Sequence, residues 1–242
     1  MCQLKSCLVL KDRVYCPIYD SHQDMLDKLG IKDDYLGASK TFVRVELTPP
    51  DGVKSLMEPL DKWTLNVDQD VTPEWWDAEA DRQRVEEAVE AWRKEHVFAE
   101  GEHIVKAGEV FAFDSAKVKA YGSATVEAWD SARVTASGNA TVEAYDRAMV
   151  KAWDSARVEA FDSARVTAWG SARVTASYNA TVEAWGSATV EAYGSTTVKA
   201  CGNAIVKAWS SARVEAFDSA TVVYPQKNKI VYPAGGTAET HD

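Results

Sequence analysis

A repeat of eight residues constrains the fold of this chain more than any other feature. From residue 105 to residue 224 the 242-residue chain divides into fifteen consecutive octads without a gap, and Val occupies the sixth position of every octad. The consensus is aromatic, Asp or Gly, Ser or Asn, Ala, any residue, Val, any residue, Ala. Such a short fixed period is typical of stacked repeats, in which each unit buries its apolar side against its neighbours.

Within each octad, Ala, Val and Ala alternate with polar residues, which is the period of two of a strand with one buried face. In the octad 153–160 we expect Ala156 and Val158 to point inward and Arg157 and Glu159 to point outward. The Asp/Gly–Ser/Asn pair supplies turn chemistry, because Gly permits positive φ and Asp, Asn and Ser bond their own backbone. The sequence therefore predicts a mainly β fold, a parallel β-solenoid of octapeptide repeats.

Two coil sizes are compatible with this repeat. Small inward side chains favour two octads, or 16 residues, per coil, because a flattened coil of that size leaves no unfilled interior. That coil stacks Asp114, Asp130, Asp146 and Asp162 about 4.8 Å apart, which costs some charge repulsion. The alternative, three octads or 24 residues per coil, separates these carboxylates. It also aligns one unbroken aromatic ladder of Tyr121, Tyr145, Trp169, Tyr193 and Phe217. We favour the 16-residue coil.

An aromatic residue opens most octads from Phe113 onward, with Ser137, Ser177 and Cys201 as the exceptions. Each ring follows an inward Ala, so we expect it to point outward at a corner, where stacked rings brace neighbouring coils. The same rings and nearby Arg residues form a candidate surface for a protein partner: Trp129, Trp153, Phe161, Trp169, Trp185, Tyr193, Trp209, Arg157, Arg165 and Arg173.

The charge of the chain is unevenly distributed. Residues 1–104 hold 13 Lys and Arg and 22 Asp and Glu, whereas residues 105–224 hold 12 and 13, so the repeat carries a net charge of −1. A nearly neutral repeat lacks the basic patch expected of a nucleic-acid-binding protein, and it does not imitate the phosphates of a duplex. No apolar run approaches membrane-spanning length, and the start of the chain lacks a secretory leader. We therefore expect a cytoplasmic protein, a monomer or small oligomer, with a protein partner and with neither nucleic acid nor membrane as a partner.

The stretch Gly138-Asn139-Ala140 with Val142 resembles the hexapeptide repeats of left-handed β-helix proteins, many of which are acyltransferases. Here each unit is two residues longer. The catalytic His of those enzymes also has no counterpart, since none of the four His residues lies within 105–224. The resemblance favours a solenoid and argues against a transferase.

The segment 1–104 is typical of a small acidic α+β head domain. Strands are predicted on both sides of residues 11–13, a helix is predicted from Asp20 or Ser21 to Gly30, and further strands are predicted within 40–50 and 61–70. Thr72-Pro73-Glu74 predicts the start of a second helix. That helix carries core-spaced Val85, Ala88, Val89 and Trp92. Residues 225–242 are expected to form a C-terminal capping strand and flexible tail.

The head offers little catalytic chemistry. We expect no catalytic residues, no metal site and no cofactor. His22 and His96 are expected on helix surfaces, and Asp68 and Asp70 in a turn. Cys2 would become an N-terminal nucleophile if Met1 were removed, but the glycine-rich start of such enzymes is absent.

Two stretches of the head, 19–52 and 63–84, carry a family resemblance. "YDSHQDMLDKLGIKDDYLGASKTFVRVELTPPDG" and "WTLNVDQDVTPEWWDAEADRQR" resemble the N-terminal part of uncharacterised proteins, often encoded by phages or mobile elements, that carry short β-repeats behind such a head. The resemblance covers roughly residues 15–97. It implies an architecture and a genomic setting but no mechanism.

Three functional hypotheses remain open. The first is a non-enzymatic interaction or scaffold protein that presents aromatic and charged ladders on a rigid solenoid, in the setting of a phage or prophage accessory protein that binds a host factor. The second is a structural solenoid that assembles with itself. The third is an enzyme that depends on Cys2. We expect no enzymatic activity and favour the first hypothesis.

Overall fold

The computed structural model describes residues 5–33, 41–225 and 237–240. The chain forms two compact units, residues 1–97 and residues 98–242, which we call the N-terminal unit and the C-terminal unit. Within the described residues, no helix is both long enough and apolar enough to cross a membrane.

The N-terminal unit is built on a small antiparallel sheet with the strand order β2-β1-β3-β4. Its strands are β1 (Lys5–Leu10), β2 (Val14–Tyr15), β3 (Phe42–Thr48) and β4 (Thr64–Val67). All six residues of β1 are buried, and in β3 the buried Val43, Val45 and Leu47 alternate with less buried residues. The predicted strands of the head are therefore confirmed.

Helix α1 (His22–Leu29) begins and ends as its sequence predicts. The Ser21 side chain accepts a hydrogen bond from the Asp24 backbone N–H at the N-terminus, and Gly30 adopts the left-handed conformation, at φ 66°, at the C-terminus. Two residues of α1, Met25 and Leu26, pack with one face of the sheet in a cluster that also contains Leu8, Leu10 and Phe42.

Helix α2 (Ala78–His96) starts later than its sequence predicts. The prediction of a start at Thr72 is wrong, because the Asp77 carboxylate caps the helix by accepting hydrogen bonds from the Glu79 and Ala80 backbone N–H groups. Residues 73–76 instead form a separate turn. Short 3-10 helices η1 (Gly52–Met57) and η2 (Leu60–Lys62) join β3 to β4.

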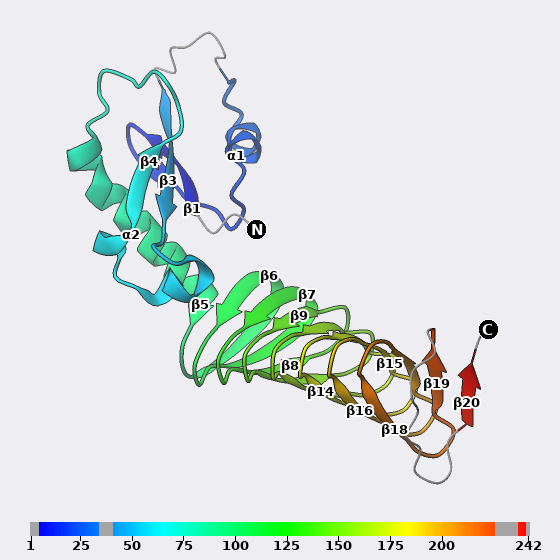
Figure 1. The fold of residues 1–242 in the computed structure, drawn as a ribbon. Helices are drawn as coiled ribbons and strands as arrows, with labels where there is room; N and C mark the ends of the chain where they lie inside the picture. The colour runs from blue at the N-terminus through cyan, green and yellow to red at the C-terminus, as the bar shows by residue number, and fades with distance from the viewer. Residues whose placement is uncertain (1–4, 34–40, 226–236, 241–242) are drawn as a thin grey trace. The chain divides into compact units, whose positions relative to one another are not determined.

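The C-terminal unit is a parallel β-solenoid with 16 residues per coil, and Figure 1 shows its coils stacked one after another. Val150 pairs with Val134 on one side and Val166 on the other, each 16 residues away. The two-octad coil is confirmed and the 24-residue alternative is wrong. The strands from the start of the unit are β5 (Val97–Phe98), β6 (Glu102–Ala112), β7 (Lys117–Ala128), β8 (Arg133–Ala136), β9 (Thr141–Ala144), β10 (Met149–Ala152), β11 (Arg157–Ala160), β12 (Arg165–Ala168), β13 (Arg173–Ala176), β14 (Thr181–Ala184), β15 (Thr189–Ala192), β16 (Thr197–Ala200), β17 (Ile205–Ala208), β18 (Arg213–Ala216), β19 (Thr221–Tyr224) and β20 (Thr237–Thr240).

Two ladders of strands form the two sides of each coil. The even-numbered strands β8 to β18 make one ladder, the odd-numbered strands β9 to β19 make the other, and β7 belongs to both because it continues around a corner. Strand β20 extends the odd ladder by pairing with β19. The rest of the expected capping segment, residues 226–236 and 241–242, lies outside the described residues.

The interior of the solenoid is almost entirely Ala and Val, and these side chains are buried. Three inward positions depart from this rule: Gly108, Thr196 and Tyr224. Thr196 is fully buried, and its hydroxyl donates to the carbonyl oxygen of Tyr193 at 2.5 Å, with the carbonyl oxygen of Ala176 at 3.3 Å. This buried hydroxyl is therefore hydrogen-bonded, as a closely packed apolar interior requires.

The backbone conformation at the corners explains why Asp or Gly occupies the second position of most octads. From residue 114 to residue 218, this position has a positive φ in every octad. Gly adopts such a conformation without strain, and Asp tolerates it better than most residues. Tyr178 occupies the same position with φ 60° and is 63% exposed.

The aromatic residues stack in two columns rather than one. One column contains Trp129, Tyr145 and Phe161. The ring centroids of Trp129 and Tyr145 are 4.0 Å apart, and those of Tyr145 and Phe161 are 5.0 Å apart. The other contains Trp153 and Trp169, stacked at 4.1 Å. The unbroken ladder expected of a 24-residue coil is absent from the described solenoid, because a 16-residue period places its members in alternate columns.

Candidate functional site

The two-sided coil separates the octads into two outward faces. We define the cationic face as the outward residues of the first part of β7 (117–120) and of β8, β10, β12, β14, β16 and β18. We define the opposite face as the outward residues of the second part of β7 (125–128) and of β9, β11, β13, β15, β17 and β19. Odd and even octads thus contribute to different surfaces, although they share one consensus.

The cationic face concentrates positive charge within a nearly neutral repeat. Its acidic residues are Glu183 and Glu215. Its basic residues are all exposed: Lys117, Lys119, Arg133, Lys151, Arg165, Lys199 and Arg213. On the opposite face, acidic residues outnumber basic ones. They are Glu127, Glu143, Glu159 and Glu191, beside Arg157, Arg173 and Lys207. The solenoid is therefore electrostatically two-sided.

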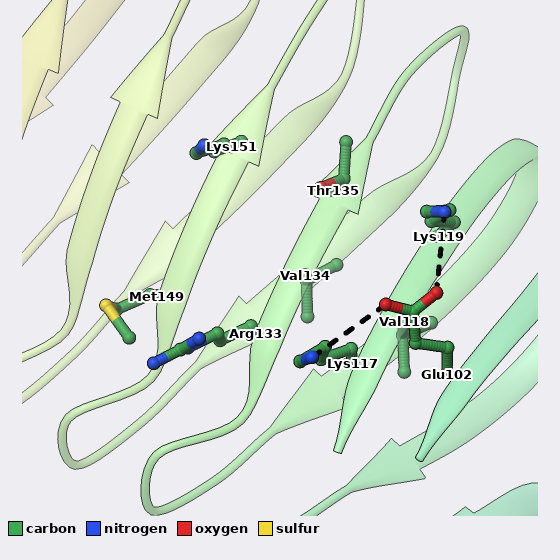
Figure 2. A pocket seen from close by; sticks show the side chains of 9 residues that line it. All are labelled: Glu102, Lys117, Val118, Lys119, Arg133, Val134, Thr135, Met149 and Lys151. Atoms are coloured by element: carbon green, nitrogen blue, oxygen red, sulfur yellow. Dashed lines mark ion pairs between the residues drawn. The ribbon is translucent and has the colours of Figure 1, made fainter. Parts of the chain in front are cut away.

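A pocket of about 420 Å³ lies at the first coils of the cationic face. Figure 2 shows Lys117, Lys119, Arg133 and Lys151 among the side chains that line it, with Glu102 of β6 beside Lys117 and Lys119. The Glu102 carboxylate is 3.8 Å from Lys117 Nζ and 3.7 Å from Lys119 Nζ. These ion pairs are long and exposed, so they neutralise the pocket only weakly.

An aromatic edge borders the cationic face. Tyr121, Trp153 and Trp185 follow the last inward Ala of their strands, and their side chains are 39%, 42% and 37% exposed. Lys199 on the face lies 5.4 Å from the ring centre of Phe217 at this edge. Cations and exposed rings therefore meet on one surface, as cation–π geometry requires.

A buried carboxyl group, that of Glu127, lies on the opposite face near its first coils. Glu127 is 4% exposed, and its pKa is raised to about 7, mainly by burial and then by the neighbouring carboxylates Glu143 and Glu109. A hydrogen bond with Trp129 lowers the pKa and partly offsets this rise. Tyr145 donates its hydroxyl to the Glu143 carboxylate at 2.6 Å. Burial of the ring, and then this bond, raise the pKa of Tyr145.

The structure does not bring the ten candidate surface residues onto one surface. Trp153, Trp169, Trp185 and Arg165 belong to the cationic face and its edge. The remaining residues belong to the opposite face and its edge: Trp129, Phe161, Tyr193, Trp209, Arg157 and Arg173. The candidate set lacks six of the seven exposed cations of the cationic face: Lys117, Lys119, Arg133, Lys151, Lys199 and Arg213. These cations could have been found in the sequence by listing the outward residues of every second octad separately, since alternate octads lie on different faces.

A second cluster that the sequence did not suggest lies in the N-terminal unit. His22, Glu46 and Asp68 each offer one possible ligand atom, and these atoms all lie within 4.8 Å of one another. The prediction that His22 lies on a helix surface is wrong, because its side chain is only 10% exposed. The three residues are far apart in sequence and meet because β3 pairs with β4 and the first turn of α1 lies against β3.

The thiols do not form a reactive centre in the described structure. Burial and a hydrogen bond with Cys16 raise the pKa of Cys7 well above its usual value, which opposes formation of a nucleophilic thiolate. Burial also raises the pKa of Cys201. Cys2, the candidate nucleophile, lies outside the described residues.

Comparison with protein-family models, with curated proteins and with solved structures finds no match to this chain. The architecture, an N-terminal α+β region followed by a β-solenoid, therefore rests on the chain's own sequence and structure.

Proposed function

We propose that this is a non-enzymatic interaction protein whose cationic face binds an acidic segment of a partner protein. One observation carries the proposal. The repeat has a net charge of only −1, yet the cationic face gathers seven basic residues against two acidic ones. Such separation attracts an anionic partner to one side of the solenoid while the other side repels it.

The aromatic edge favours a polypeptide over a nucleic acid as the anionic partner. Single-stranded nucleic acids bind by stacking their bases on free aromatic ring faces. Here Trp153 and Trp169 already stack on each other, with an interplanar angle of 10°, so their ring edges rather than their inner faces are available. Exposed Trp and Tyr beside Arg are the residue types that dominate protein–protein interfaces.

The regular solenoid supports binding by fixing the positions of these side chains before the partner arrives. Each strand of the cationic face is paired on both sides from β8 to β16. Lys117 and Arg133 are paired on adjacent strands, at the interstrand spacing of about 4.8 Å, whereas Arg133 and Arg165 are held two strands apart. A preorganised surface loses less conformational entropy on binding than a flexible one.

The biological setting of this proposal comes from the resemblance of residues 15–97 to phage and mobile-element proteins. In that setting the protein acts in the cytoplasm as a phage or prophage accessory protein, a monomer or small oligomer, that binds a host factor. An acidic segment of that host factor is the partner to which the cationic face is suited.

Two matched triple variants test the proposal. The first is Lys119→Gln, Arg133→Gln and Arg165→Gln on the cationic face. The second is Lys207→Gln, Arg157→Gln and Arg173→Gln on the opposite face. Each removes one Lys and two Arg, all exposed. Each also breaks one long ion pair, Lys119 with Glu102 or Lys207 with Glu191. Binding of a labelled glutamate-rich peptide is measured by fluorescence anisotropy at several salt concentrations.

The wild type is expected to bind the peptide in a salt-dependent way. The cationic-face variant is expected to lose at least about tenfold in affinity, since each exposed ion pair contributes up to about 1 kcal/mol. The opposite-face variant should bind at least as well as the wild type. Equal losses in both variants, or a tighter complex with a thymidine oligonucleotide of equal length, would contradict the proposal.

A further inference from the structure

We propose that the N-terminal unit holds a divalent transition-metal ion between His22, Glu46 and Asp68. The three residues come from three separate elements: the first turn of α1, the middle of β3 and the residue that follows β4. Their ligand atoms all lie within 4.8 Å of one another. An imidazole and two carboxylates thus lie close together at one side of a folded sheet.

The imidazole of His22 is oriented as a metal ligand requires. Its Nε2 lies 3.2 Å from the carbonyl oxygen of Val45, to which the ring donates its N–H. This bond leaves Nδ1 directed toward Asp68 Oδ2, also at 3.2 Å. In the neutral imidazole, two acceptors then face each other, and a cation between them removes the repulsion. A backbone carbonyl that fixes the other ring nitrogen is the usual outer support of a ligating His.

The two carboxylates are also held by ordered backbone. The Asp68 backbone N–H donates to the carbonyl oxygen of Arg44 at 2.9 Å, which continues the pairing of β3 with β4. Glu46 lies opposite Ser6 of β1 and Asn66 of β4. A ligand set supported by paired strands keeps its geometry better than one supported by loops.

Ser6 is a neighbour of the cluster with unused hydrogen-bonding capacity. Its side chain is buried, and its hydroxyl has no hydrogen-bond partner among the described residues. Because Ser6 and Glu46 are directly opposite in the β1–β3 register, their side chains lie on the same face of the sheet. The hydroxyl is therefore placed to support the Glu46 carboxylate once that carboxylate coordinates an ion.

The donor set indicates the class of ion. Imidazole nitrogen with carboxylate oxygen suits zinc and other divalent first-row metals, whereas magnesium and calcium prefer oxygen donors alone. Three protein ligands leave coordination positions for water. The Asp68 side chain is 58% exposed, so the cluster is open to solvent on that side.

Calorimetric titration of zinc into the full-length protein, after removal of metal with a chelator, tests the site. The ligand variants are His22→Gln, Glu46→Gln and Asp68→Asn. The matched control is Asp70→Asn, which removes an exposed carboxylate two residues from Asp68. Far-UV circular dichroism verifies that each variant is folded. Cobalt binding is followed by absorption, because a thiolate ligand gives a charge-transfer band that nitrogen and oxygen ligands lack.

The wild type is expected to bind one equivalent of zinc, and each folded ligand variant to lose at least about tenfold in affinity. Asp70→Asn should bind as the wild type does, and the cobalt complex should show no thiolate band. The proposal is overturned if the wild type binds no zinc, if His22→Gln binds it unchanged, or if a thiolate band appears and is lost in Cys7→Ser.

Discussion

The carboxylate of Asp218 accepts a hydrogen bond from the backbone N–H of Gly202, one coil earlier, at 3.1 Å. The same bond joins Asp154 to Gly138 at 3.4 Å. Stacked corner carboxylates look unfavourable in the sequence because like charges repel. Within the stacked column, the Asp162 carboxylate likewise accepts a hydrogen bond from the Asp146 backbone N–H of the preceding coil, at 3.4 Å, and charge-assisted bonds of this kind are stronger than neutral ones.

The first prediction concerns this corner bond. Asp154→Ala should lower the free energy of unfolding by about 1–2 kcal/mol, because it removes the bond to Gly138 and places Ala at φ 58°. Asp154→Asn keeps an acceptor and tolerates the same φ, so it should lie close to the wild type. Urea denaturation compares the two variants, and equal stability of Ala and Asn would show that the bond contributes nothing.

The second prediction contrasts two corner glycines with similar φ. A Cβ at Gly122 would lie 2.7 Å from the carbonyl oxygen of Lys106, whereas a Cβ at Gly186 would lie 3.4 Å from its nearest neighbour. Both Ala variants incur the left-handed strain of about 1–2 kcal/mol. Only Gly122→Ala must also displace backbone, so thermal unfolding should begin at a clearly lower temperature in this variant. Indistinguishable unfolding curves would refute the steric argument.

The fold of the solenoid was predictable because the repeat specifies it locally. Val158 and Arg157 point inward and outward as the period of two predicts, and the small Ala side chains favoured the 16-residue coil that the structure shows. The start of α2 was not predictable in this way. Thr72 and Asp77 both carry capping chemistry, and only the bonds from Glu79 and Ala80 to Asp77 decide between them.

The candidate sites were harder to predict, for two different reasons. The net charge of the repeat is a sum over both faces of the solenoid. It therefore does not reveal that Lys119 and Arg133 share one face while Glu127 and Glu143 share the other. The cluster around His22 depends on the pairing of strands separated by long connections. No local pattern in a single sequence encodes that pairing.

The third prediction separates stability from binding at the aromatic edge. Trp153 stacks on Trp169, whereas Trp185 forms no ring stack with any described residue. Trp153→Ala should therefore lose about 0.5–1.5 kcal/mol more stability than Trp185→Ala. Both should weaken binding of the glutamate-rich peptide, because both rings are exposed beside the cationic face. Unchanged peptide binding in Trp185→Ala would remove the aromatic edge from the proposed interface.

The last prediction concerns the pH dependence of stability. Burial raises the pKa of Glu127 from 4.5 to about 7 in the folded protein, so the folded state retains a proton that the unfolded state releases. The free energy of unfolding should therefore fall as the pH rises from about 4.5 to about 7 and should change little above that range. Glu109 and Glu143 on the neighbouring strands add to the effect, because both repel the charged form.

Glu127→Gln removes this titration while keeping the size of the side chain. The variant should be more stable than the wild type above pH 7, by up to about 3 kcal/mol, which is the whole shift converted to free energy. The difference should disappear as the pH falls below about 4.5, where Glu127 is protonated in both states. Chemical denaturation at a series of pH values measures both curves, with Glu159→Gln on the exposed part of the same face as the control. Parallel curves for the wild type and Glu127→Gln would show that the carboxyl group is not titrating in this range.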